Sequence, residues 1–248
     1  MKTKTITTTL HPIVMGCMLL CILSLSSCMD VDYYPCVRPN GHVVEETRVA
    51  PAFTGIELRL HGQVFIAPGS EHSVVVETSE NLMDLVRTSV SGGKLVIEQD
   101  RCIRCRLDDI NIYITMPRIT ELSLAGSGRI IVTEAWVADD LLLNVSGSGL
   151  ISGSFTSEQI RTRITGSGDV DIRGVTMDHS IRISGSGQVH AREMQCNRAE
   201  VRLSGSGSAS LSVSDLLDAR ITGSGSIYFS GDPAIKSSIT GTGKIVKL

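Results

Sequence analysis

Aromatic side chains are scarce in this chain, which has four Phe, four Tyr and one Trp among its 248 residues. A large conventional core packed with rings is therefore not expected. Basic residues are also few, since 23 Lys and Arg stand against 26 Asp and Glu, a formal net charge of −3. A nucleic-acid-binding surface needs a basic footprint, so the composition argues against a nucleic-acid partner.

A long hydrophobic run is missing as well. Residues 13–25 form an apolar stretch that is too short for a membrane-spanning helix of roughly 20 residues. Lys2 and Lys4 precede it, and it ends in Leu25-Ser26-Ser27-Cys28. This ending resembles the bacterial lipobox, in which the Cys is acylated and becomes the first mature residue. We therefore predict that residues 1–27 are a signal peptide and that Cys28 is the lipidation site, the alternative being an ordinary secretory signal that contains a Cys.

Acylation at Cys28 would make the membrane a partner through the N-terminal lipid, because each buried methylene of an acyl chain contributes ~0.8 kcal/mol to membrane binding. Without Lys2 and Lys4 the mature chain has 21 basic and 26 acidic residues, a net charge of −5. Asp30 and Asp32 follow Cys28 closely and loosely resemble the acidic export signals of surface lipoproteins in Bacteroidota. We therefore expect the protein in the cell envelope, anchored by lipid to the outer membrane and exposed on the surface.

Cysteine usage fits an exported protein. After removal of the signal peptide and acylation of Cys28, four thiols remain: Cys36, Cys102, Cys105 and Cys196. Four thiols allow three connectivities. Cys102 and Cys105 have CxxC spacing, but neither the βαβ context of a redox motif nor a second ligand pair for zinc accompanies them. A local Cys102–Cys105 disulfide is therefore the expectation, and no metal site is predicted.

The strongest signal is a recurring tripeptide. Gly-Ser-Gly occurs six times and Gly-Thr-Gly once, at intervals of 21, 19, 19, 20, 18 and 18 residues. The glycines of these tripeptides are Gly126, Gly128, Gly147, Gly149, Gly166, Gly168, Gly185, Gly187, Gly205, Gly207, Gly223, Gly225, Gly241 and Gly243. Self-similarity at such a period indicates a stacked, repetitive architecture.

The residues around each tripeptide alternate with a period of two, which is typical of a strand with one buried face. Ile181, Ile183, Gly185, Gly187 and Val189 share one parity and therefore one face of an extended chain. Each tripeptide is interpreted as a corner, and one corner per 18–21 residues predicts an all-β fold, a parallel β-helix whose rungs lie ~4.8 Å apart. A β-propeller would need ~40–50 residues per blade.

The domain organisation follows from where the repeat is regular. Residues 28–40, with Pro35 and Pro39, are interpreted as a tether, and residues 41–248 as a single β-helix domain. Within it, 121–248 carry the regular coils. Residues 41–120 are expected to be degenerate coils and a cap, because the terminal repeats of solenoids are usually atypical, with worn corners around Gly62 and Gly92-Gly93.

A family resemblance can be stated on three sets of residues. Phe53-Thr54-Gly55-Ile56, the run Gly92-Gly93-Lys94-Leu95-Val96-Ile97 and the Gly-Ser-Gly series resemble the putative auto-transporter adhesin head (GIN) family, a domain of unknown function abundant in Bacteroidota. The resemblance covers roughly residues 53–246. It implies a right-handed β-helix and a surface or envelope location, and it carries over no catalytic residue and no cofactor.

Catalytic motifs are hard to find in this chain. The G-x-S-x-G nucleophile elbow does not occur, and Asp169 and Asp171 share an outward face without a matching partner one coil away. Asp108-Asp109 and Asp139-Asp140 are adjacent, so their side chains would diverge in a strand. The histidines lack metal-ligand spacing and are interpreted as surface residues: His42, His61, His72, His179 and His190. A β-helix glycan-processing lyase or hydrolase remains the alternative to a non-enzymatic protein.

One outward feature points to a ligand. Arginine occupies the position three residues before the first glycine of four successive tripeptides, at Arg163, Arg182, Arg202 and Arg220. Coils in register would stack these four, and like charges directly opposite in a sheet are unfavourable. Glu200 and Asp218 can offset the later two, whereas Arg161 and Ser180 occupy the same column earlier.

The Arg163–Arg182 end should therefore be the more basic end of the column. The hypothesis is a stripe that binds an anionic polymer through bidentate guanidinium contacts, and the alternative is a solvated face. The sequence thus predicts a non-enzymatic envelope lipoprotein, a surface adhesin or binding module for glycan or protein partners.

Overall fold

The fold is taken from a computed structural model that describes residues 35–248. The predicted signal peptide, 1–27, and Cys28 lie outside the described residues. Residues Cys36–Leu248 form one compact unit. Within the described part of the chain, no helix is long and apolar enough to cross a membrane.

Strands dominate the fold and join into one 17-stranded sheet. The strands of the N-terminal half are β1 (Val43–Thr47), β2 (Gly55–Leu58), β3 (Gln63–Pro68), β4 (Ser73–Ser79), β5 (Val86–Ser91), β6 (Lys94–Gln99), β7 (Ile110–Met116), β8 (Glu121–Gly126) and β9 (Arg129–Val132). The remaining strands are β10 (Trp136–Gly147), β11 (Leu150–Gly166), β12 (Asp169–Gly185), β13 (Gln188–Gly205), β14 (Ser208–Gly223), β15 (Ser226–Ser230), β16 (Ala234–Gly241) and β17 (Lys244–Lys247). Two short helical turns interrupt them, α2 (Glu80–Met83) and η1 (Leu107–Asp109).

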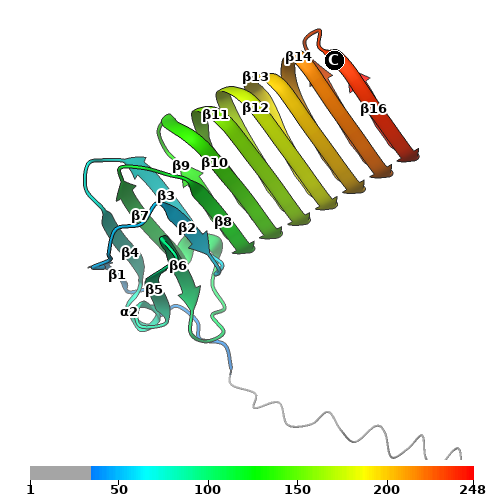
Figure 1. Ribbon diagram of the computed structural model, residues 1–248. Helices are drawn as coiled ribbons and strands as arrows, with labels where there is room; N and C mark the ends of the chain where they lie inside the picture. The colour runs from blue at the N-terminus through cyan, green and yellow to red at the C-terminus, as the bar shows by residue number, and fades with distance from the viewer. Residues whose placement is uncertain (1–34) are drawn as a thin grey trace, which may run out of the picture. The chain divides into compact units, whose positions relative to one another are not determined.

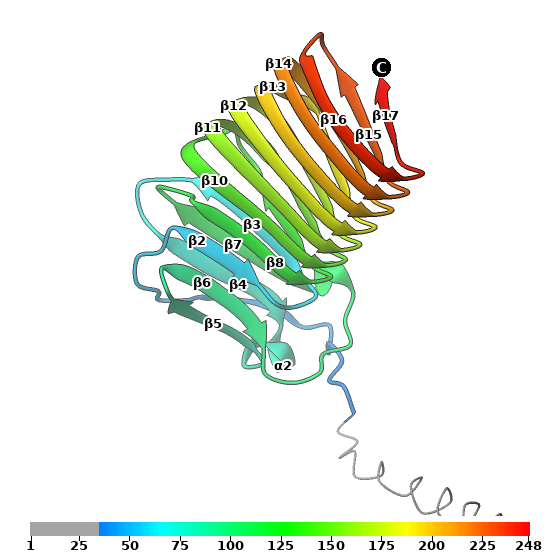
Figure 2. The same cartoon turned by 45° about the vertical axis from the view of Figure 1, so that its right-hand side comes forward.

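The C-terminal half is a β-solenoid. Each long strand from β10 to β14 pairs in parallel with its successor, as the successive ribs in Figures 1 and 2 show. The strands are long because they wrap around the core. In β11 the buried positions shift from Phe155 and Ser157 to Ile160, Thr162 and Ile164, so the inward parity changes within one strand. About seven turns are formed in this way, and the prediction of a stacked parallel β architecture is confirmed.

The solenoid core is a stack of aliphatic columns. Ile164, Ile183, Leu203 and Ile221 lie on consecutive rungs in register, and each is at most 2% exposed. β-Branched side chains suit such a surface because their restricted χ1 packs well on a pleated sheet. Burial of each side chain contributes about 1.5–3 kcal/mol. Few aromatic rings are needed because every rung supplies the same aliphatic filling.

Each Gly-Ser-Gly tripeptide interrupts the strand, and from the second tripeptide onward its glycines are stacked on those of the preceding rung. A Cβ on Gly185, whose φ is +124°, would lie 2.4 Å from the carbonyl oxygen of Gly166, and a Cβ on Gly187 would lie 2.5 Å from that of Gly168. The amide of Ser186 donates to the same Gly166 oxygen at 2.9 Å. The glycines are therefore required by the close approach of two backbones, a tighter constraint than the crowded bend expected from the sequence.

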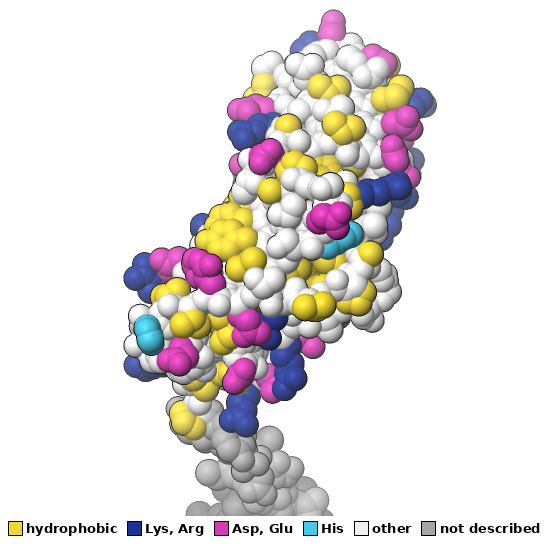
Figure 3. Space-filling model, turned by 90° about the vertical axis from the view of Figure 1, so that its left-hand side faces the viewer, with side chains coloured by type: hydrophobic (Ala, Val, Ile, Leu, Met, Phe, Trp, Pro, Cys, Tyr) yellow, Lys and Arg dark blue, Asp and Glu magenta, His cyan; other side chains and the backbone are white. Residues whose placement is uncertain are grey.

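The N-terminal half is a mixed, curled sheet rather than a row of successive worn coils. β2 pairs in parallel with both β6 and β8, and β3 with both β7 and β9. The β2–β3 segment therefore lies between segments that follow it in sequence, and β1, β4 and β5 add antiparallel pairs. Figure 3, which views the molecule from the left-hand side of Figure 1, shows a hydrophobic patch among polar atoms on that face.

The two segments predicted to be degenerate corners, around Gly62 and Gly92-Gly93, differ in structure. Gly62 is stacked beside the first tripeptide, because its carbonyl accepts from the Arg129 amide at 2.9 Å and His61 hydrogen-bonds to Ser127 at 3.0 Å. Gly92 and Gly93, with φ values of +58° and +74°, instead form the turn of the antiparallel β5–β6 hairpin. Interpreting the glycine pair as a corner was therefore wrong, because two consecutive positive φ values are typical of a two-residue hairpin turn.

The expected Cys102–Cys105 disulfide is also wrong, because Cys102 is bonded to Cys36. Val37 forms a parallel bridge with Ile103, and its amide donates to the Cys102 carbonyl at 2.9 Å. This bridge brings the Cα atoms of the two cysteines to 4.7 Å, within the range that a disulfide spans. Cys105 stays free, and its thiol donates to the carbonyl of His61 at 3.6 Å. The chain is thus fastened from Cys36 onward, within the stretch expected to be a tether.

His179 is a core residue and not a surface one. Its side chain is 1% exposed, and its Nε2 hydrogen-bonds to Oγ1 of the buried Thr162 at 3.0 Å. Among the described residues its Nδ1 has no partner. Burial lowers the pKa of His179 to about 4 from its ordinary 6.5, because desolvation disfavours the charged imidazolium. The sequence misplaced it because the inward parity shifts within β12.

The glycine stack yields a stability prediction. Gly185→Val should lower the free energy of unfolding by at least about 3 kcal/mol, because its Cβ would meet backbone and the residue would keep a positive φ. Ser186→Ala is the matched control, since Ser186 is exposed and a lost hydrogen bond costs only ~1 kcal/mol. The two variants are compared by urea unfolding. A Gly185→Val protein as stable as wild type would show that the glycines do not need their close contact.

The buried imidazole yields a pH prediction. In the unfolded chain His179 takes up a proton near pH 6.5, whereas in the fold it does so only near pH 4. The unfolded state therefore binds the additional proton between these values, and the free energy of unfolding should fall by up to about 3 kcal/mol as the pH drops from 6.5 to 4. His179→Gln should remove this part of the slope in urea unfolding at pH 7, 5.5 and 4.5. Equal slopes in both proteins would contradict a neutral, buried His179.

Candidate functional site

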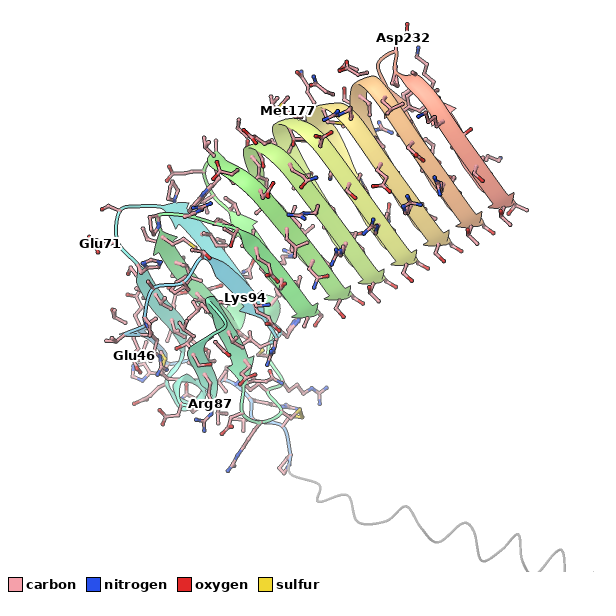
Figure 4. The ribbon with its side chains drawn as sticks, in the orientation of Figure 1. Glu46, Glu71, Arg87, Lys94, Met177 and Asp232 are labelled. Atoms are coloured by element: carbon pink, nitrogen blue, oxygen red, sulfur yellow. A yellow bond between two sulfur atoms is a disulfide. The ribbon has the colours of Figure 1, made fainter. Side chains whose placement is uncertain are left out.

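Four guanidinium groups form an outward column on the solenoid. Arg163 of β11 lies in register with Arg182 of β12, which pairs with Arg202 of β13, which in turn pairs with Arg220 of β14. Figure 4 shows nitrogen-tipped side chains projecting from the front of these successive ribs. Adjacent strands lie ~4.8 Å apart, so the predicted stacking of the four arginines is confirmed.

Hydroxyl groups form a second column beside the arginines. Two residues farther along each rung, a Ser or Thr side chain is exposed and in register with the next. The column consists of Ser146, Thr165, Ser184, Ser204, Thr222 and Thr240. Between the two columns runs a shallow groove of about 420 Å³, lined by both sets of side chains from β11 to β14. One wall of the groove is cationic and the other offers hydroxyl donors and acceptors.

Counter-charges are distributed unevenly along the column. Arg202 Nε lies 2.6 Å from Glu200 Oε1, and Arg220 Nε lies 3.5 Å from Asp218 Oδ1. In the described part of the chain, no ion pair joins Arg163 or Arg182 to a carboxylate. The prediction of a more basic Arg163–Arg182 end is therefore confirmed by geometry.

The neighbouring column does not neutralise this basic end. Arg161 occupies it on β11 and is paired with Asp140 at 3.6 Å, while Ser180 occupies it on β12. On the next column Asp178 is already bound by Arg198 through two contacts of 2.6 and 2.7 Å. Exposed ion pairs of this kind contribute little, about 0–1 kcal/mol. The guanidinium groups of Arg163 and Arg182 therefore remain available for an external anion.

The arrangement suits binding of anionic oxygen groups. A guanidinium presents planar donors that match carboxylate, sulfate and phosphate in a bidentate manner, and hydroxyls can complete the contact. Among residues 35–248, no group of three or more His, Cys, Asp and Glu could hold a metal ion.

A second constellation was missed by sequence reasoning. Asp171, His190 and Ser210 lie on consecutive rungs in register, the three residue types of a hydrolase triad. The hydroxyl of Ser210 is buried and donates to the Val189 carbonyl at 3.3 Å. Within the described residues no hydrogen bond or ion pair joins His190 to Asp171 or Ser210. The nucleophile-to-base contact that activates a serine is therefore not made.

An aromatic pair was missed as well. The rings of Phe65 and Tyr113 are stacked with centroids 5.3 Å apart, on strands β3 and β7 that are distant in sequence and paired in space. The tripeptide period could not predict this pairing. The β2–β3 segment lies between β6–β7 and β8–β9 in the sheet, although it precedes both in the sequence. The alternation of Val64, Phe65 and Ile66 was the only local signal, since it placed the ring on the outward parity.

Solved structures share this fold. A putative adhesin from Bacteroides fragilis is 22% identical, with a TM-score of 0.79, over 86% of this chain and all of that one. A putative lipid binding protein from Parabacteroides distasonis is 24% identical with a TM-score of 0.72, and a putative adhesin from the same species is 19% identical with a TM-score of 0.72. Each of these two comparisons also covers 86% of this chain and all of the other. Among curated proteins, none matches the chain.

The family comparison covers most of the chain and agrees with the resemblance seen in the tripeptides. Residues 52–233 match the family described as putative auto-transporter adhesin, head GIN domain. This stretch contains the Arg column, the aromatic pair and all of the hydroxyl column except Thr240. The chain therefore belongs to the putative auto-transporter adhesin head GIN domain family.

Proposed function

We propose that this protein is a non-enzymatic surface adhesin or binding module whose groove of arginines and hydroxyls holds an anionic polymer. The observation that carries the proposal is the in-register stack of four arginines, of which Arg163 and Arg182 have no carboxylate partner among the described residues. Like charges on neighbouring rungs destabilise a sheet. A bound anion would remove this repulsion, so ligand binding and the sheet would stabilise each other.

A polymer fits the groove better than a small anion does. Every rung from β11 to β14 offers the same pair of groups, one guanidinium and one hydroxyl. A chain with repeating carboxylate, sulfate or phosphate groups, laid across the strands, can contact several rungs at once. The rigid, stacked backbone presents these groups without prior ordering, which lowers the entropic cost of binding.

The family name and the adhesin descriptions of the structures from Bacteroides fragilis and Parabacteroides distasonis support an adhesive role. We further propose that each Gly-Ser-Gly tripeptide is a corner of a right-handed coil. An acylated Cys28 would anchor the protein in the outer membrane and leave the solenoid facing outward. Glycans of the envelope or of a host, and anionic proteins, are the partners that this placement would make accessible.

The groove can be tested with paired double variants. Arg163→Ala with Arg182→Ala should weaken binding to uronate and sulfated polysaccharides by about 10- to 100-fold, since a hydrogen bond to a charged group contributes about 1.5–3 kcal/mol. It should also flatten the dependence of binding on salt. Arg202→Ala with Arg220→Ala is the matched control and should have a smaller effect, because these arginines already contact Glu200 and Asp218. Unchanged binding in both double variants, measured by calorimetry, would place the adhesive surface elsewhere.

The anchor is tested separately. Cys28→Ala, combined with an ordinary cleavable signal peptide so that export continues, should move the protein from the detergent phase to the aqueous phase. The physical reason is the loss of the acyl chains, which hold a protein at ~0.8 kcal/mol per buried methylene. Mass spectrometry of the mature N-terminus serves as the control for processing. Detergent partitioning that is identical in wild type and variant would rule out lipid anchoring at Cys28.

A further inference from the structure

A row of apolar side chains crosses the outer face of the mixed sheet. Ile131 of β9 pairs with Phe65 of β3, which pairs with Tyr113 of β7, which pairs with Val75 of β4. All four occupy outward positions, with their sequence neighbours in the core. Figure 3 views the molecule from the left-hand side of Figure 1, where β3, β4 and β7 lie, and a hydrophobic patch is visible on that face.

The two rings form the centre of this row. Their planes are inclined by only 16° at a centroid distance of 5.3 Å, and Tyr113 keeps 41% of its surface exposed. Isolated exposed apolar residues are normal on a protein surface. Here, however, two of the nine aromatic residues of the whole chain are held together, partly exposed, on a rigid sheet.

Planar polar side chains form a second row beside the rings, two residues away on the same strands. Gln63 Nε2 donates to Asn111 Oδ1 at 3.3 Å, and Asn111 Nδ2 donates to Glu77 Oε1 at 2.8 Å. Arg129 and Glu45 continue the row at its two ends, in register with Gln63 and Glu77. The chain of hydrogen bonds fixes the orientation of each amide, so the row presents a fixed pattern of donors and acceptors.

The electrostatics of this face select the charge of a ligand. Partial burial raises the pKa of Tyr113, and the nearby carboxylates of Glu77 and Glu45 raise it further. These two carboxylates lie directly opposite each other on β4 and β1. At this end of the row, away from Arg129, an anionic group would be repelled, whereas the hydroxyl groups of a neutral ligand can donate to the carboxylates.

We propose that this face binds a neutral pyranose unit of a glycan. One face of such a sugar is rich in C–H groups and can pack across the apolar row, against the outward side of the stacked Phe65–Tyr113 pair. Its hydroxyl edge then reaches Gln63, Asn111 and Glu77. A lipid surface fits less well, because the apolar row is one side chain wide and is bordered by carboxylates. The site is separate from the Arg groove in residues and in ligand charge.

The test uses the mature chain and a panel of neutral gluco-, galacto-, manno- and xylo-oligosaccharides, titrated by calorimetry. Wild type should bind at least one of them. Phe65→Leu with Tyr113→Leu keeps apolar side chains on the sheet but removes the rings, and it should weaken binding about tenfold or more with little change in Tm. Tyr113→Phe retains the ring and should remain within about threefold of wild type.

Two further arms separate the outcomes. Arg163→Ala with Arg182→Ala should bind the neutral sugar as wild type does, so failure of the Arg groove and failure of this site are distinguishable. Phosphatidylcholine vesicles should not bind. Absence of binding to every neutral oligosaccharide, unchanged affinity in the Leu pair, or vesicle binding that the Leu pair abolishes would each overturn the proposal.

Discussion

The close contact between stacked glycines is the constraint on which the rest of the solenoid depends. The carbonyl oxygen of Gly166 occupies the space where a Cβ of Gly185 would lie, and the same contact recurs between Gly185 and Gly205. Only glycine permits this approach, and a slip of one residue would bring a side chain against the neighbouring backbone. The register of every rung is therefore fixed at its tripeptide. The aliphatic columns of the core and the outward columns of the surface follow from that register, because a strand presents alternate residues to opposite faces.

The register is fixed next to each tripeptide, whereas the part of each coil farther from the tripeptide can differ in length. The intervals between tripeptides range from 18 to 21 residues. The structure accommodates the differences as register shifts on β12–β14, between Asp171 and Gly174, between Ala191 and Gln195, and between Cys196 and Arg198. All three shifts precede the Arg column in their strands, and the pairing is continuous from Arg198 to Gly205, so the arginines stay three residues before each tripeptide. The same coil thus carries one face of constant register, with the candidate Arg column, and a second face whose register varies. Bulges commonly reorient side chains without disturbing the rest of a sheet.

Residues close to a tripeptide could be placed from the sequence, whereas residues beyond a register shift or in the mixed sheet could not. The stacking of Arg163 on Arg182 could be predicted, because both are counted from a glycine whose register is fixed. The core position of His179 could not, because the inward parity shifts within β12 on the way to it. The Cys36–Cys102 disulfide and the Phe65–Tyr113 pair depend on pairings between segments that are distant in sequence. A periodic pattern predicts contacts between neighbouring repeats, and it carries no information where β2–β3 is inserted between later segments.

The placement of charge separates the two candidate binding surfaces. On the Arg column, Glu200 and Asp218 relieve repulsion at one end and leave Arg163 and Arg182 without carboxylate partners among the described residues. On the mixed sheet, Glu45 and Glu77 lie opposite each other next to an apolar row. Each arrangement places like charges on neighbouring strands, which destabilises the sheet locally. A fold that is stabilised elsewhere tolerates such a local cost, and costs of this kind are typical of functional sites. Because the charges at the two surfaces differ, we expect them to select different units of a ligand, acidic ones at the Arg column and neutral ones at the mixed sheet. A glycan that carries both neutral and acidic units could contact both, so that two weak sites act together through the effective concentration that a shared chain provides.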